Sequence, residues 1–217
     1  LITVSSQEMV DYYTSKGYKV SLIPNAINID ELSKEENRIF DKQIIYVARL
    51  SEEKGIHEVI RACEKLSDDI NVIILGDGPK KNKVEEISKR RKNIHYLGSK
   101  NRDETIQLIR GSDLLIQPSQ MEGGISYTLM EAMACHTPII CTDVGGGKDM
   151  LMHLENAFLI KPKNSDELLH AILTLISDEK QRKNLAESAF TSVKKYDWTS
   201  IGNLYLKLYD ELINNIK

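Results

Sequence analysis

The chain has 217 residues, of which 41% are hydrophobic and 28% are charged. This length and composition allow a sizeable buried core and are typical of one globular domain or slightly more. The formal net charge of -3 excludes a polybasic nucleic-acid-binding protein, so any anion-binding site must be local.

Three cysteines bear on the cellular compartment and on metal binding. Cys63, Cys135 and Cys141 lie in apolar stretches and lack the spacing of metal ligands. This pattern favours reduced thiols inside a core, and hence a cytoplasmic protein. We expect no membrane span and no signal peptide, because no apolar run approaches roughly 20 residues, and peripheral membrane contact stays open.

The chain begins at Leu1 within an apolar run, ITVSS, that resembles a strand. We interpret this start as a sign of a piece cut from a longer protein. An amphipathic helical segment then leads to Gly17, which is a plausible helix stop. Residues 19–24 predict a strand, and the polar residues 28–41 predict a loop or linker.

From residue 44 onward, short apolar runs alternate with helical patterns, and the last third of the chain is helical. Continuous apolar strands separated by helices predict a parallel sheet covered on both faces, hence a doubly wound α/β domain. Ligands of such sheets bind at the carboxyl ends of the strands. The expected strands are residues 44–48, 71–76, 93–98, 113–118, 138–142 and 157–162, and the expected helices between them are residues 55–66, 80–91, 103–110, 127–135 and 148–153.

Residues 118–147 read PSQMEGGISYTLMEAMACHTPIICTDVGGG and combine a strand end, a polar turn and a helix start. Glu122 and Glu131 bracket the first amides of that helix. Unpaired amides and the positive end of the helix dipole attract anions, while carboxylates accept hydrogen bonds from sugar hydroxyls. The stretch therefore indicates a site for a phosphorylated, hydroxyl-rich ligand.

Both glutamates also have a purely structural interpretation. Glu122 would then complement the helix dipole, and Glu131 would be a solvated helix position. Glu131, however, lies in the otherwise apolar segment LMEAMAC, which predicts a helix buried nearly all round. A buried carboxylate needs polar partners, and ligand hydroxyls would serve.

Two cations follow the first regular strand in the segment VARLSEEKG, where Arg49 lies just beyond the strand and Lys54 precedes the next helix. At the carboxyl edge of a parallel sheet such a pair can hold a diphosphate, the arginine through a planar fork and the lysine as a point charge. The alternative is a solvated basic pair beside Glu52 and Glu53.

Several reaction classes lose support because their motifs are missing from the sequence. Gly76 and Gly78 lack the GxGxxG spacing of a dinucleotide fingerprint and favour a tight turn. No GxxxxGK[ST], HExxH or GxSxG motif occurs, which disfavours ATP hydrolysis, metal catalysis and hydrolase chemistry. The three glycines at 145–147 precede an expected helix start near Lys148 and offer further amides, with a flexible loop as the alternative.

Several segments together resemble the group 1 glycosyltransferases, specifically the C-terminal, donor-binding domain of glycosyltransferase family 4. That family has the GT-B fold of two facing Rossmann-like domains. In chain order, the segments are IPNAINID, VARLSEEKGI, VIILGDGP, IHYLGS, LLIQPSQMEGG, LMEAMACHTPIICTDVGG and YDWTSIGNLYLKLYDEL. The resemblance implies a retaining, metal-independent hexosyltransferase of polysaccharide biosynthesis. It would move a sugar from a UDP- or GDP-sugar to a glycan, lipid or small-molecule acceptor, with no permanently bound cofactor.

The resemblance also implies a role for each candidate residue. The catalytic residues Arg49 and Lys54 would bind the donor diphosphate and offset the charge that develops on it. Glu122 would face hydroxyls of the transferred sugar, and Glu131 would take the ribose hydroxyls. The backbone expected to contact the donor belongs to Leu97, Gly98 and Ser99 at the base and to Ile125, Ser126, Tyr127 and Thr128 at the sugar or phosphate.

The sequence departs from the family pattern around the central turn. Eight residues separate Glu122 from Glu131, one more than usual, and EGGIS replaces the usual EGFG, so the turn must carry an extra residue. His136 stands where glycine is usual and must accept a left-handed conformation or end the helix differently. Asp149 stands where glutamate is frequent.

The domain boundaries follow from the same resemblance. Residues 1–18 are assigned to the end of an absent N-terminal acceptor-binding domain, 19–195 to the nucleotide-sugar-binding domain and 196–217 to a C-terminal helix that crosses back. We expect the chain alone to bind a nucleotide or nucleotide sugar weakly and to transfer nothing. The alternatives are a non-catalytic binding or scaffolding subunit and a sugar-nucleotide epimerase of the same build.

Overall fold

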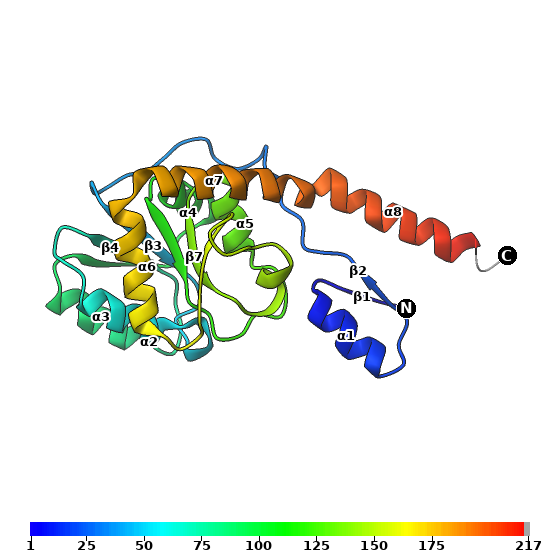
Figure 1. The fold of residues 1–217 in the computed structure, drawn as a ribbon, viewed down its shortest axis with the longest axis horizontal. Coiled ribbons are helices and arrows are strands. Elements are labelled where there is room, and N and C mark those ends of the chain that lie inside the picture. Colours follow the sequence, from blue (N-terminus) through cyan, green and yellow to red (C-terminus); the bar gives the residue numbers. More distant parts are fainter. Residues whose placement is uncertain (215–217) are drawn as a thin grey trace.

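The computed structural model describes residues 1–214 and contains two parallel sheets of different size (Figure 1). The smaller sheet pairs β1 (Ile2–Val4) with β2 (Val20–Leu22). The larger sheet has six strands in the order β5-β4-β3-β6-β7-β8. Its strands are β3 (Gln43–Val47), β4 (Asn71–Leu75), β5 (Ile94–Gly98), β6 (Leu114–Gln117), β7 (Ile139–Thr142) and β8 (Phe158–Ile160).

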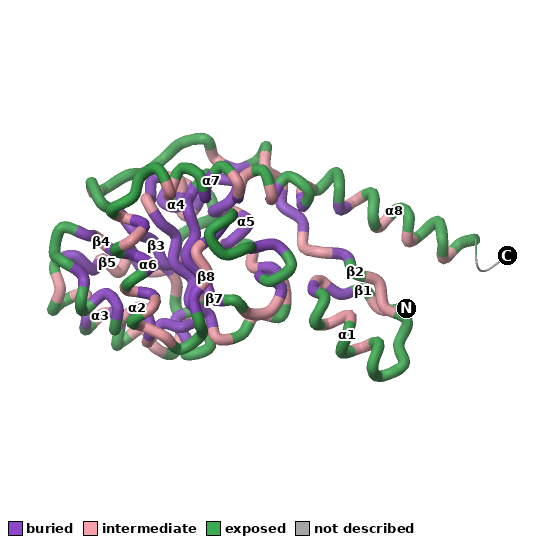
Figure 2. The backbone as a smooth tube through the Cα atoms, viewed as in Figure 1, coloured by how far each residue is buried: buried purple, intermediate pink, exposed green. Residues whose placement is uncertain are grey.

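Helices cover both faces of the larger sheet, which confirms the predicted doubly wound α/β fold. The helices are α1 (Gln7–Ser15), α2 (Ile56–Glu64), α3 (Lys81–Arg90), α4 (Arg102–Arg110), α5 (Tyr127–Ala134), α6 (Ser165–Ser177), α7 (Glu179–Val193) and α8 (Trp198–Asn214). Successive residues of β3 point to opposite faces, so Ile44 packs with α2, α3 and α6, while Ile45 packs with α4, α5 and α7. The inner strands β3, β6 and β7 and the neighbouring β4 are almost completely buried (Figure 2), which explains their continuous apolar sequences, whereas the edge strands β5 and β8 are partly exposed.

The predicted strands and most predicted helices agree with the observed ones to within a few residues, but the helix predicted at residues 148–153 is wrong. A short 3₁₀ helix covers Gly145–Asp149 instead. Gly145 has φ 54°, and a Cβ on it would lie 1.9 Å from the carbonyl oxygen of Glu122. The glycines therefore belong to the 3₁₀ helix itself, because they pack against the turn that carries Glu122.

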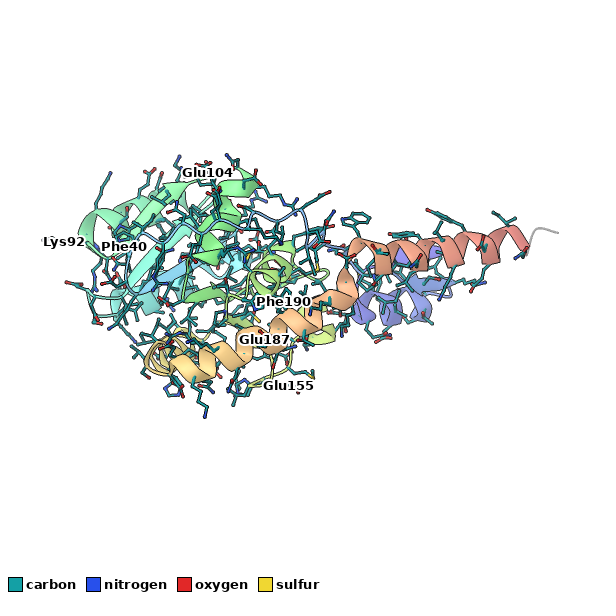
Figure 3. All side chains as sticks on the ribbon, turned by 90° about the horizontal axis from the view of Figure 1, so that it is seen from above. Phe40, Lys92, Glu104, Glu155, Glu187 and Phe190 are labelled. Carbon is teal, nitrogen blue, oxygen red and sulfur yellow. The ribbon has the colours of Figure 1, made fainter. Side chains whose placement is uncertain are left out.

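His136 follows the end of α5 in the left-handed conformation, which is one of the two predicted possibilities, with φ 55°. Its ring stacks on Phe190, with ring centroids 4.0 Å apart, and its Nδ1 lies 3.4 Å from a carboxylate oxygen of Glu187. Both partners belong to α7 (Figure 3). Contacts from α7 thus offset the strain of a non-glycine residue at this position.

The N-terminal segment and α8 lie together at one end of the molecule (Figures 1 and 3). The strand at Val20–Leu22 pairs with β1 and not with the larger sheet. In α8, Ile201 is buried, whereas Trp198, Leu206 and Tyr209 are more than half exposed. The predicted C-terminal crossing helix covers residues 196–217, and its last three residues lie outside the described part of the chain. Within that described part, no helix combines the length and the apolar character required to cross a membrane.

Gly55 links Lys54 to the start of α2 at a point of close backbone contact. Its φ is 72°, and a Cβ on it would lie 1.9 Å from the carbonyl oxygen of Pro118. We expect Gly55→Ala to lower the free energy of unfolding by about 2–5 kcal/mol, because it combines left-handed strain with overpacking. Urea unfolding measures the change. The matched control is Gly202→Ala in α8, where a Cβ meets nothing within 4 Å, and equal stability of both variants would contradict this packing.

Candidate functional site

The larger sheet reverses its winding between the neighbouring strands β3 and β6. From β3 the chain proceeds to β4 and β5 on one side, and from β6 it proceeds to β7 and β8 on the other. The carboxyl ends at such a switch point border the crevice in which ligands of open α/β sheets bind. Arg49 and Lys54 follow β3, and Glu122 follows β6, so the predicted cations and the first predicted carboxylate border the same crevice.

Lys54 and Glu122 form an ion pair across this crevice. Lys54 Nζ lies 2.6 Å from Glu122 Oε1, and the two side chains are 27% and 13% exposed. The Tyr46 hydroxyl donates a hydrogen bond to the carbonyl oxygen of Lys54 at 3.0 Å, and burial raises the pKa of Tyr46, so that it stays a donor. Arg49 is exposed, and its side chain makes no hydrogen bond or ion pair with residues 1–214, so its guanidinium faces solvent at the same edge.

Gln117, the last residue of β6, connects Glu122 to the start of α5. Gln117 Nε2 donates to Glu122 Oε1 at 3.1 Å, and Gln117 Oε1 accepts from the Ser126 hydroxyl at 3.3 Å. Gln117 as a whole is only 4% exposed. Gln117 is not among the predicted site residues, although its place as a polar residue at the end of an apolar strand, beside the predicted site, is a signal in the sequence.

The first amides of α5 are not capped by a side chain. Ser126 occupies the N-cap position, but its hydroxyl bonds to Gln117 and makes no capping bond. The amides of Tyr127 and Thr128 have no intrahelical acceptor, as at the start of any α-helix, and none elsewhere in the described chain. These amides and the helix dipole form a ready binding place for an anion.

Glycines of the 145–149 segment support the turn that carries Glu122. A Cβ on Gly145 would lie 1.9 Å from the carbonyl oxygen of Glu122, and one on Gly146 would lie 2.5 Å from the amide nitrogen of Ile125. Only residues without a side chain allow this approach. The Ile125 side chain is itself buried, at 2% exposure, and anchors the turn in the core.

The N-terminal segment holds the same turn from another side. The Ser6 hydroxyl donates to the carbonyl oxygen of Gly123 at 3.1 Å, and Asn25 Nδ2 donates to that of Ile125 at 2.9 Å. The amide of Gln7 donates to Asp149 Oδ2 at 2.9 Å. The turn, the glycine segment and the N-terminal segment therefore form one connected set of contacts.

Glu131 lies on α5, roughly 7.5 Å further along the helix axis than Ser126. Its side chain is 13% exposed, and its Oε1 lies 3.3 Å from Nε of Arg102, at the start of α4. Burial raises the pKa of Glu131, and the hydrogen bond with Arg102 offsets part of this rise. No described residue bonds Oε2, which leaves one oxygen for a ligand hydroxyl. Arg102 was also missed by the sequence analysis, because nothing local marks it.

Gly98 is the last residue of β5 and Ser99 follows it, at the same carboxyl edge of the sheet. Gly98 has φ 69°, and its carbonyl oxygen accepts a hydrogen bond from the amide of Gly76 at 2.9 Å. The chain then enters α4 and reaches Arg102, the partner of Glu131. The residues predicted for the base and for the ribose therefore border neighbouring positions.

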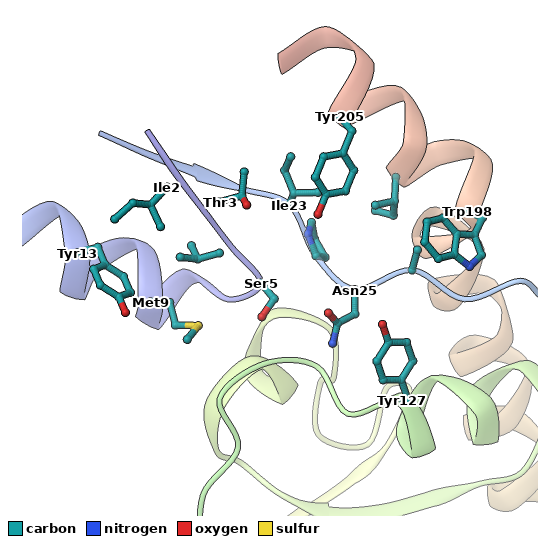
Figure 4. Close-up of a pocket in the computed structure, with 14 residues that line it drawn as sticks. Ile2, Thr3, Ser5, Met9, Tyr13, Ile23, Asn25, Tyr127, Trp198 and Tyr205 are labelled. Carbon is teal, nitrogen blue, oxygen red and sulfur yellow. The ribbon is translucent and has the colours of Figure 1, made fainter. Parts of the chain in front are cut away.

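Two open pockets flank the Glu122 turn. One, of about 390 Å³, lies between α1 and the Lys54–Glu122 pair and is lined in part by Tyr12, Tyr13 and Met121. The other, of about 340 Å³, lies between the N-terminal segment and α8, next to Tyr127 and Trp198 (Figure 4). The hollow directly between Gln117, Glu122 and Ser126 holds only about 10 Å³. That hollow has room for about one water molecule at most. Residues 1–214 contain no group of three or more His, Cys, Asp or Glu side chains arranged to hold a metal ion.

Comparison with known sequences gives a family match and several relatives. The model of the family described as glycosyl transferases group 1 matches residues 28–192. The N,N'-diacetylbacillosaminyl-diphospho-undecaprenol alpha-1,3-N-acetylgalactosaminyltransferase of Campylobacter jejuni is 31% identical over 186 residues, which cover 83% of this chain and 48% of the relative. An uncharacterized glycosyltransferase of Methanocaldococcus jannaschii is 30% identical over 231 residues, which cover 96% of this chain and 59% of the relative. The chain spans about half the length of these relatives.

Solved structures share the fold. Anabaena Alr3699/HepE in complex with UDP-glucose gives a TM-score of 0.85 at 22% identity, covering 97% of this chain and 64% of the other. Sucrose-phosphate synthase from Thermosynechococcus elongatus gives a TM-score of 0.85 at 20% identity, covering 98% of this chain and 58% of the other. At such identities the likeness shows the fold alone.

The raised pKa of Glu131 predicts that this residue destabilises the folded state at neutral pH. When folding raises the pKa of a carboxyl group, the resulting loss of stability depends on pH. The loss is absent at pH values well below the ordinary pKa and complete at pH values above the raised pKa. We expect Glu131→Gln to be more stable than the wild type at neutral pH, since the exposed Arg102 loses little without its partner. Its advantage should shrink as the pH falls through the raised pKa and vanish well below the ordinary glutamate pKa.

Urea unfolding at neutral pH and at about pH 4 measures this difference. Glu86→Gln, on the exposed side of α3, is the matched control and should show no such pH-dependent gain. A Glu131→Gln variant that is less stable than the wild type at neutral pH would contradict the assigned cost of burial.

Proposed function

Since this chain belongs to the group 1 glycosyl transferases, we propose that the crevice between β3 and β6 binds the nucleotide-sugar donor of a retaining, metal-independent transferase of glycosyltransferase family 4. The observation that carries the proposal is the meeting of Lys54 and Glu122 at 2.6 Å, beside the uncapped start of α5. A cation, a carboxylate and free amides at one sheet edge match a ligand that contains both phosphates and hydroxyls.

The free groups of the site suggest an order for the parts of the donor. The diphosphate would lie against Arg49, Lys54 and the amides of Tyr127 and Thr128. The transferred sugar would bond the open oxygen of Glu122. The ribose would bond the open oxygen of Glu131, roughly 7.5 Å further along α5. The base would then lie along the backbone at residues 97–99, where peptide groups provide no side-chain selection between UDP and GDP.

During transfer, the bond from the anomeric carbon of the sugar to the diphosphate oxygen breaks, and the oxygen of an acceptor hydroxyl forms the new bond to that carbon. The proton of that hydroxyl passes to an oxygen of the departing diphosphate or to solvent. Negative charge grows on the departing diphosphate. Arg49 and Lys54 would offset this charge in a partly water-excluded crevice. Lys54 would exchange its partner Glu122 for a phosphate, which frees the carboxylate to face the sugar.

We propose that this chain acts as the C-terminal half of a longer hexosyltransferase, whose other half binds the acceptor. The chain spans about half the length of its relatives, and one relative's name specifies a diphospho-undecaprenol acceptor. That name supports our proposal of a glycan or lipid-linked acceptor. We further propose a role in polysaccharide biosynthesis, with the enzyme in the cytoplasm and in peripheral contact with a membrane. The 217-residue chain would bind the donor weakly and transfer nothing alone.

A second candidate is a non-catalytic binding or scaffolding subunit with the same fold. The direct Lys54–Glu122 pair and the hollow of only about 10 Å³ beneath the turn favour it, because both restrict room for a sugar. The two candidates differ in whether the crevice binds a nucleotide.

Calorimetric titration of the chain with UDP, GDP and ADP distinguishes these candidates. We expect at least one nucleoside diphosphate to bind, and Glu131→Ala to weaken that binding roughly tenfold, because the ribose loses hydrogen bonds to a charged group. The exposed Glu155 provides the control substitution Glu155→Ala. Absence of binding by the folded wild-type chain would favour the scaffold.

Arg49 is expected to act on turnover. In the enzyme with both halves, Arg49→Ala should lower kcat by about 100-fold, since it removes a charge that stabilises the leaving group. Steady-state transfer assays measure the loss, with Arg61→Ala, exposed on α2, as the control. An unchanged kcat would remove Arg49 from the mechanism.

A further inference from the structure

Gln117 is a polar residue at a position where the rest of the strand is apolar. The three preceding residues of β6, Leu114–Ile116, are completely buried and belong to the two hydrophobic clusters. A buried amide costs free energy unless it is hydrogen-bonded, and here both ends of the amide are used. Its nitrogen bonds Glu122 and its oxygen accepts from Ser126. Gln117 therefore spans the turn that carries the extra residue.

The two donors that reach Glu122 share one of its oxygens. Lys54 Nζ and Gln117 Nε2 both contact Oε1, at 2.6 and 3.1 Å. No hydrogen bond from residues 1–214 reaches Oε2. The carboxylate is thus held by one oxygen and presents the other. Of the two donors, Lys54 is the one that an incoming diphosphate would attract, because it carries the charge.

We propose that Gln117 is a positioning residue that fixes the orientation of Glu122 toward the donor sugar once Lys54 has turned to the diphosphate. This inference rests on the proposed donor-binding function and assigns to this chain a residue that acts through Glu122. A neutral amide suits the task, because the diphosphate does not draw it away. Its bond to Ser126 fixes the amide plane and thereby the direction of the N–H group.

Nucleotide sugar and free nucleotide differ in the sugar and in the charge of the terminal phosphate. For a substitution that changes no charge, such as Gln117→Met, the ratio of their dissociation constants therefore isolates the sugar contact. Any general loosening of the site, including a change at the α5 amides, affects both ligands and cancels in the ratio. The experiment titrates the chain with UDP and UDP-glucose, UDP and UDP-N-acetylgalactosamine, and GDP and GDP-mannose. The pair that the wild type binds most tightly is then used for the variants Gln117→Met, Glu122→Gln and the double variant.

We expect Gln117→Met to reduce the preference for the nucleotide sugar over the nucleotide roughly three- to tenfold, which corresponds to the net contribution of one ordinary hydrogen bond. Glu122→Gln should reduce it similarly. The double variant should show no further loss, because Gln117 acts through Glu122. Gln120→Met, in the same turn and without a side-chain hydrogen bond to the described residues, is the matched control and should leave the ratio unchanged.

An unchanged ratio in Gln117→Met, or a further loss in the double variant, would overturn the positioning role. Should Gln117→Met fail to fold, Gln117→Glu keeps the acceptor for Ser126 but sets a second carboxylate against Glu122, and it should reduce the ratio as well. Failure of the wild type to bind any of these ligands would contradict the proposed function itself, and this inference with it. The two failures are therefore distinguishable.

Discussion

The contact between Lys54 and Glu122 joins the two halves of the larger sheet at the point where its winding reverses. Both side chains are largely withdrawn from solvent, so the cost of removing two charges from water offsets much of their attraction. The pair is accordingly weak evidence of stabilisation. Its place at the switch point, beside uncapped amides, instead indicates a site in which charges are kept ready for a ligand.

Close backbone packing makes this arrangement rigid. Gly55 lies against Pro118, and Gly145 and Gly146 lie against the Glu122 turn, at separations that a Cβ would close. Each contact links the end of one strand to the segment after another. These main-chain contacts therefore hold in place the segments that carry Lys54 and Glu122. Burial disfavours the ionised form of Glu131, so this carboxylate lowers the stability of the folded chain. The close packing of the rest of the site can offset that loss.

The sheet and most of its helices could be predicted from the sequence, because periodicity and apolar runs are local properties. The carboxyl-edge positions of Arg49, Lys54 and Glu122 follow directly from that pattern. Gln117 and the pairing of Arg102 with Glu131 could not be derived, since they depend on segments that meet only in the folded chain. The helix predicted after the three glycines failed for the same reason, because contacts with the Glu122 turn decide its geometry.

A crystal structure of this chain with a bound nucleotide sugar tests the central claim most directly. The account predicts diphosphate oxygens within hydrogen-bonding distance of Arg49, Lys54 and the first amides of α5, with the ribose at Glu131 and the Lys54–Glu122 contact broken. A ligand bound elsewhere, for example beside Trp198 between the N-terminal segment and α8, with the Lys54–Glu122 contact intact, would contradict it.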